Sequence, residues 1–166
     1  MTINLADFPN MRTGNYRLTS DPVPDENCIA HACGARGEWW EPVTGRFWPV
    51  GPPYCNYKVQ SLVRVFERYG YVACDSAACE PEYERIAVYG REGMYTHAAR
   101  QLIADGTWTS KLGPEDDINH ATPEVLADGA YGEVVTIMRR RRSGHEEAHC
   151  CERQERAAQQ QNRPAL

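Results

Sequence analysis

An Asp-Gly pair at residues 105–106 constrains the fold most, because it separates two segments with the character of β-strands. The segment MYTHAARQL (94–102) precedes the pair, and TWTSKLG (107–113) follows it. Asp-Gly between two such segments is typical of a β-hairpin. Further strands are predicted at RIAVYG (85–90) and GEVVTIMRR (132–140). The second half of the chain is therefore expected to form an antiparallel sheet of about four strands.

The first half of the chain predicts two helices. NYKVQSLVRVFERYGY (56–71) has apolar residues at helical spacing, so one face should cover a core. Asn56 is the expected cap of this helix, and Gly70 its end. ENCIAHACG (26–34) predicts a shorter helix, which Asn27 or Asp25 could cap and Gly34 could end. Helices followed by antiparallel strands indicate the α+β class.

Composition sets the domain limits and excludes some partners. A chain of 166 residues suits one domain, which we place at residues 1–142, and the charged, Gln-rich residues 143–166 predict a disordered tail. The net charge of −5 makes nucleic acid an unlikely main partner, although the arginine run 139–142 could contact phosphates. No leader and no membrane span are visible, so we expect a cytoplasmic protein, or one exported without a visible signal.

Seven cysteines are many for this length, and their spacing is irregular. In a reducing compartment they would be free thiols, metal ligands or catalytic groups. Cys28, His31 and Cys33 lie close together, and the tail contains HEEAHCC (145–151). A structural zinc site usually shows two tight cysteine pairs, and the chain has no such arrangement. We therefore expect no bound metal and no cofactor.

Cys28 and His97 are the clearest candidates for catalytic residues. Cys28 stands at the predicted start of a helix, where a thiolate is favoured. A nucleophilic cysteine also needs a base within hydrogen-bond reach, and His97 on a predicted strand could supply it. The alternative is a purely structural role for both residues. Cys28 would then be a buried thiol that packs its helix on the sheet, and His97 a strand histidine bonded to a backbone carbonyl.

Several segments resemble, in order, a family of uncharacterised bacterial domains. They are NCIAHACG, WWEP followed by FWP, ERIAVYG, THAARQLIADGTWTSKLG and DINHATPEVL, and they span roughly residues 15–140. The family pattern has a tryptophan where this chain has His31. A helix-borne cysteine followed by a sheet whose first or second strand carries histidine also resembles compact papain-like cysteine hydrolases. This resemblance implies a papain-like core, with the cysteine helix packed on the small sheet.

The papain-like resemblance also implies a third polar residue on the second strand of the hairpin. By position this residue is Ser110. Such families more often carry His, Asn or Gln there, so Asp117, Asn119 and His120 remain alternatives.

The resulting expectation is a papain-like cysteine hydrolase acting on amide, isopeptide or related acyl bonds. Cys28 would be the nucleophile, His97 the base, and Asn27 with the helix start would hold the oxyanion. The predicted substrate groove is lined by Trp39, Trp40, Trp48 and Trp108. The partner would be a peptide or another amide-containing substrate. The alternative is a catalytically inactive papain-like domain that binds a protein partner.

Overall fold

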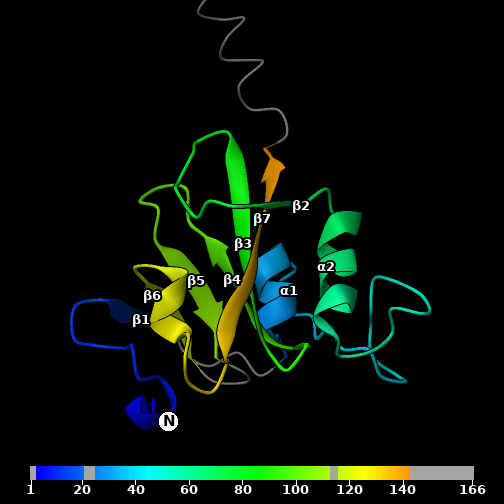
Figure 1. The fold of residues 1–166 in the computed structure, drawn as a ribbon, viewed down its shortest axis with the longest axis horizontal. Coiled ribbons are helices and arrows are strands. Elements are labelled where there is room, and N and C mark those ends of the chain that lie inside the picture. The colour runs from blue at the N-terminus through cyan, green and yellow to red at the C-terminus, as the bar shows by residue number, and fades with distance from the viewer. Residues whose placement is uncertain (1–2, 21–24, 113–115, 143–166) are drawn as a thin grey trace, which may run out of the picture.

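The computed structural model describes residues 3–20, 25–112 and 116–142, which form one seven-stranded sheet with short helices on its faces (Figure 1). The strand order is β1-β6-β5-β4-β3-β7-β2, and every neighbouring pair is antiparallel. The strands are β1 (Tyr16–Ser20), β2 (Val72–Cys74), β3 (Tyr83–Arg91), β4 (Met94–Gln101), β5 (Trp108–Lys111), β6 (Asp117–His120) and β7 (Glu133–Arg141).

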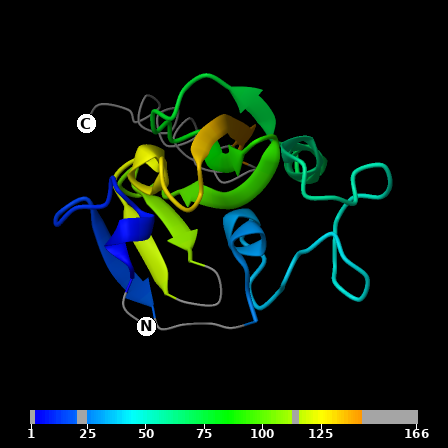
Figure 2. The same ribbon diagram turned by 60° about the horizontal axis from the view of Figure 1, so that its bottom comes forward.

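The two faces of the sheet are covered by different parts of the chain. Helices α1 (Cys28–Cys33) and α2 (Val59–Arg68) pack on one face, against β3, β4 and β5. The other face is covered by the N-terminal segment and by η2 (Pro123–Leu126), a single turn of 3-10 helix. A second such turn, η1 (Leu5–Asp7), lies in the N-terminal segment. Figure 2 shows α1 beside the strands of the hairpin, with the N-terminal segment on the side away from α2.

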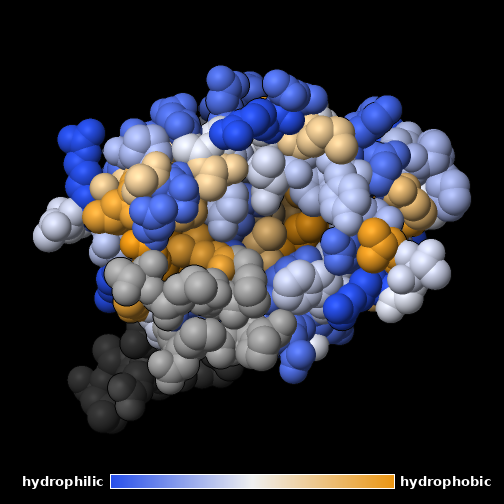
Figure 3. Space-filling model, turned by 90° about the horizontal axis from the view of Figure 1, so that it is seen from below, coloured by the Kyte–Doolittle hydropathy of each residue, from blue (hydrophilic) through white to orange (hydrophobic). Residues whose placement is uncertain are grey.

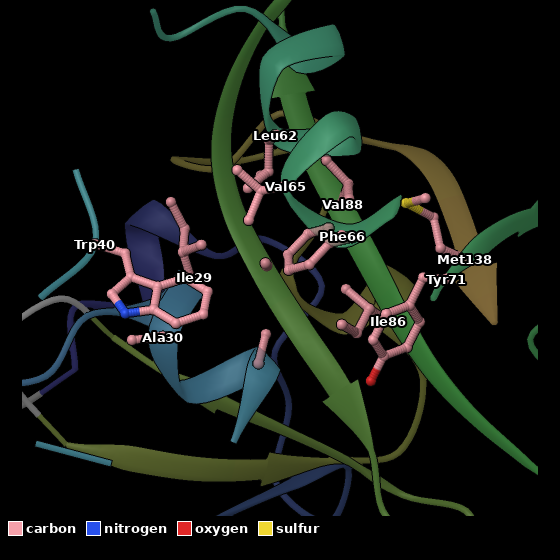
Figure 4. Close-up of a cluster of buried hydrophobic side chains, with 12 residues drawn as sticks. Ile29, Ala30, Trp40, Leu62, Val65, Phe66, Tyr71, Ile86, Val88 and Met138 are labelled. Atoms are coloured by element: carbon pink, nitrogen blue, oxygen red, sulfur yellow. The ribbon is translucent and has the colours of Figure 1, made fainter. Parts of the chain in front are cut away.

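Successive residues of the central strands point to opposite faces of the sheet and pack into two separate hydrophobic cores. The first lies under the helices and contains Ile86, Val88 and Ala98 from the strands (Figure 4). The second lies on the opposite face and contains their neighbours Ala87 and Ala99. Each central strand is therefore buried on both sides, and its position in the molecule is fixed by both cores.

The expected fold class is wrong. The structure is mostly a seven-stranded antiparallel sheet with two short helices, not an α+β papain-like core on a sheet of about four strands. Three strands were missed, namely β1, β2 and β6. Strand β6 gives no hydrophobic signal because its residues 117 and 120 are polar and find partners on β5: Asp117 pairs with Lys111, and His120 with Ser110. Strands β1 and β2 are edge strands of five and three residues, which are too short to show a clear alternating pattern.

The individual elements predicted from local signals are confirmed. Asn27 caps α1 by accepting from the N–H of Ala30, and Gly34 ends it in the left-handed conformation, with φ 76°. Strands β4 and β5 pair as a hairpin whose loop contains Asp105-Gly106. Helix α2 buries Leu62 and Phe66 on its core-facing side, but the expected cap Asn56 is wrong, because the helix begins after Lys58 and has no side-chain cap. The predicted tail, residues 143–166, lies outside the described residues.

Candidate functional site

Cys28 lies where the hairpin strands separate. Strands β4 and β5 pair at only two positions, Arg100 with Thr109 and Gln101 with Trp108. If the pairing continued, Ala98 would lie opposite Lys111. Instead, the backbone N–H groups of Ala98, Cys28 and Ile29 act on the Cys28 sulfur and lower the pKa of its thiol.

Burial outweighs these three donors in setting the protonation state of Cys28. Desolvation raises the pKa of the Cys28 thiol to about 11, although the three N–H groups lower it. The thiol is therefore protonated at neutral pH in this structure. Cys33, at the other end of the helix, has its pKa raised to about 12 by burial, without backbone donors.

His97 is buried without a hydrogen bond. Its side chain is 1% exposed, and neither ring nitrogen has a partner among the described residues. It does not bond to the Cys28 sulfur, so the expected Cys–His pair is not in hydrogen-bond contact. Burial lowers the pKa of His97 well below its usual value, and the charges of His120 and His31 lower it further. Unsatisfied buried side chains are rare and call for an explanation.

Two aromatic rings surround His97 on the face opposite α1. The ring of Tyr131 stacks on it, with centroids 4.0 Å apart and planes 1° apart. The ring of Tyr89 contacts it at 5.3 Å and 59°. Tyr131 was not singled out in the sequence. The available signal was its position between Gly129 and Gly132, which indicates a tight turn.

Ser110 and His120 bond to each other rather than to His97. The Ser110 hydroxyl lies 2.9 Å from His120 Nε2, and His120 Nδ1 lies 2.8 Å from the carbonyl oxygen of Thr122. A carbonyl can only accept, so Nδ1 carries the proton and Nε2 accepts from Ser110. Burial lowers the pKa of His120 to about 4. Of the four residues considered as the third member, none bonds to the ring nitrogens of His97.

Asn27, expected to help hold the oxyanion, has structural partners for both side-chain atoms. Its Oδ1 accepts from the N–H groups of Ala30 and Trp40, and its Nδ2 donates to the Trp40 carbonyl at 2.7 Å. The side chain therefore connects the start of α1 to the backbone of Trp40.

The four tryptophans expected to line a groove occupy different environments. Trp40 and Trp108 are 3% and 1% exposed, and they lie in the two separate cores. Trp48 is half-buried and stacks on Tyr95. Trp39 lines a pocket of about 460 Å³ with Arg46 and Phe47, and the Arg46 guanidinium lies over its ring. The four side chains therefore do not form one groove.

A polar chain crosses from α1 to the sheet at His31. His31 Nδ1 lies 2.8 Å from Glu26 Oε1, and His31 Nε2 lies 3.1 Å from Thr109 Oγ1. The second carboxylate oxygen of Glu26 accepts from the N–H of Gly37. His31 is thus a satisfied buried histidine that joins the helix to β5. Neither Glu26 nor Thr109 was predicted from the sequence to be part of a site.

The chain was compared with known families and structures. It matches a domain of unknown function, DUF7689, over residues 17–139. The chain belongs to this family. No curated protein and no solved structure matches it. Membership in an uncharacterised family was expected and is confirmed, whereas the papain-like resemblance and the particular motifs find no support in these comparisons.

The DUF7689 region contains all the residues considered above as catalytic. It starts in β1 and ends in β7, so it includes both Cys28 and the loop that carries Tyr131. Within the described part of the chain, no three His, Cys, Asp or Glu side chains gather in a way that could hold a metal. No helix described here is both long and apolar enough to cross a bilayer.

The arginine run at the end of the family region is engaged with neighbouring groups. Arg139 lies 3.6 Å from Glu80 and stacks its guanidinium over Tyr83. Arg140 pairs with Glu84, and Arg142 donates to the carbonyl of Pro81. These contacts tie β7 to β3 and to the segment before it.

Proposed function

We propose that the protein is a thiol-dependent hydrolase that cleaves an amide or related acyl bond through Cys28 and His97. The observation that carries this proposal is the arrangement along β4. The backbone N–H of Ala98 lowers the pKa of the Cys28 thiol, and its neighbour His97 is buried with both ring nitrogens unpartnered.

The proposed reaction passes one proton through His97 in each of its two stages. His97 takes the thiol proton of Cys28 as the sulfur attacks the carbonyl carbon of the substrate. The imidazolium then gives this proton to the leaving amine, and the acyl group stays on sulfur as a thioester. Water attacks the thioester, His97 takes a proton from that water, and the proton returns to sulfur as the acid product leaves.

Cys28 is half-buried and His97 is buried, and this environment supports a pair that rests in its neutral form. Burial disfavours both the thiolate and the imidazolium, so the proton stays on Cys28. The three backbone N–H groups that lower the pKa of the Cys28 thiol would favour the thiolate once it forms. The reaction requires the His97 ring, which lies on the face opposite α1 in this structure, to come into hydrogen-bond contact with Cys28 when substrate binds.

A second candidate is a domain that binds a partner without catalysis. The raised pKa of the Cys28 thiol favours this reading, because an inert structural cysteine has the same property. Large apolar side chains are also exposed, among them Leu18 and Phe47. In Figure 3, apolar residues gather in the middle and on the left of the face seen from below.

Acyl transfer from an activated ester separates the two candidates. We expect p-nitrophenyl acetate to leave one acetyl group on Cys28, read by mass spectrometry of the native protein after proteolysis. His97→Gln should slow this acetylation at least tenfold, the lower range for general-base assistance being about a hundredfold. Cys33, on the same helix but without the backbone donors, is the internal control. Equal acetylation of Cys28 in both proteins, or equal labelling of Cys28 and Cys33, would contradict the hydrolase.

A further inference from the structure

We propose that Tyr131 is the positioning residue of His97, and that its ring has the orienting role expected of a polar third residue. This inference rests on the proposed function. It starts from the finding that none of Ser110, Asp117, Asn119 and His120 bonds to either ring nitrogen of His97. A histidine base with no orienting group would lose the geometry that proton transfer needs.

The contact between Tyr131 and His97 is well suited to holding the imidazole plane. The two rings are parallel within 1° at a centroid distance of 4.0 Å, and Tyr89 contacts the imidazole at a steep angle. Stacking fixes the plane of a ring but leaves its edges open. Both nitrogens of His97 are therefore left without a hydrogen-bond partner among the described residues.

Tyr131 is itself held in place by three contacts. Its carbonyl accepts a hydrogen bond from the hydroxyl of Thr96, the residue before His97. The ring of Phe8 meets its ring edge-on at 5.2 Å. The preceding residue, Ala130, donates its N–H to the carbonyl of Asp7 at 2.7 Å. The tyrosine is therefore fixed both to β4 and to the N-terminal segment.

The same tyrosine lies near the sulfur. The pKa of Tyr131 is raised, first by burial and second by the negative charge of a Cys28 thiolate. One side chain thus contacts the base and lies within the electrostatic range of the nucleophile. The electron-rich face of the phenol ring also favours the imidazolium that forms during the reaction.

A double-mutant cycle distinguishes positioning from simple packing. The readout is the rate of Cys28 alkylation by iodoacetamide at pH 7, followed by mass spectrometry in wild type, Tyr131→Leu, His97→Gln and the double variant. We expect Tyr131→Leu to slow alkylation about tenfold in the wild-type background and to have no effect when His97 is already replaced. Tyr131→Phe keeps the stacked ring and should restore the wild-type rate.

The possible outcomes separate this inference from the proposed function. If His97→Gln slows alkylation but Tyr131→Leu has the same effect in both backgrounds, the tyrosine does not act through His97 and the inference is overturned. The same conclusion follows if Phe and Leu at position 131 behave alike. If His97→Gln leaves the alkylation rate unchanged, the proposed function fails, and the inference fails with it. Urea unfolding of each variant shows whether the fold is retained.

Discussion

Asn27 shows how much local structure a single side chain can hold. Its amide caps α1 and also makes two bonds to the backbone of Trp40, thirteen residues further along the chain. The cap could be predicted from sequence because it is local. The loop contact could not, because no pattern in the sequence shows where Trp40 returns. The same limit applies to His97, whose stacking partner Tyr131 is distant in sequence.

Asn27→Ala should lower the free energy of unfolding by about 2–3 kcal/mol, because it removes a helix cap and leaves the buried Trp40 carbonyl without its donor. Asn27→Asp keeps the cap acceptor and loses only the donor, so we expect a smaller loss. Urea unfolding followed by tryptophan fluorescence measures both. Equal losses for Ala and Asp would mean that the cap contributes nothing.

Strand β6 explains why local patterns revealed only part of the sheet. The central strands β3 and β4 have apolar residues on both faces, and both were predicted. In β6, by contrast, Asp117, Asn119 and His120 are buried polar residues. The segment therefore shows neither the alternating apolar pattern of a strand nor the apolar spacing of a helix. Their partners become visible only when β5 is placed beside them. Element order was therefore readable for β3, β4, β5 and β7, whereas the size of the sheet was not.

The turn after η2 depends on close contact with the N-terminal segment. A methyl group at Gly129 would lie 2.0 Å from the carbonyl oxygen of Asp7. Gly129→Ala should therefore push the segment away and lower the free energy of unfolding by about 1–3 kcal/mol. Gly51→Ala is the matched control, because nothing lies within 4 Å of the added group. Urea unfolding measures the loss, and limited proteolysis should cut the N-terminal segment of Gly129→Ala faster. A loss no greater than that of the control would contradict the packing described here.

The molecule as a whole buries three neutral histidines, at positions 31, 97 and 120. The pKa of each is lowered chiefly by burial, that of His120 to about 4. On unfolding, each returns to the ordinary value of 6.5 and binds a proton more readily. The unfolded state therefore gains protons first as the pH falls, and stability is lost below pH 6.5.

Between pH 6.5 and pH 5, the lowered pKa of His120 should reduce the free energy of unfolding by up to about 2 kcal/mol, and the lowered pKa values of His31 and His97 act in the same direction. Urea unfolding at a series of pH values from 8 to 5 tests this expectation, and His120→Gln should make the dependence on pH shallower. Stability that stays constant over this range would show that folding does not lower the pKa values of these histidines.

The pH dependence of Cys28 alkylation tests the central claim most directly. A neutral thiol–imidazole pair and a thiolate–imidazolium pair contain the same protons, so their exchange does not depend on pH. With His97 as base, the alkylation rate of Cys28 by iodoacetamide should stay nearly constant from about pH 5 to pH 9. In His97→Gln only free thiolate reacts, and the rate should rise roughly tenfold per pH unit. The same steep rise in the wild-type protein would show that Cys28 is an isolated buried thiol and would contradict the proposed hydrolase.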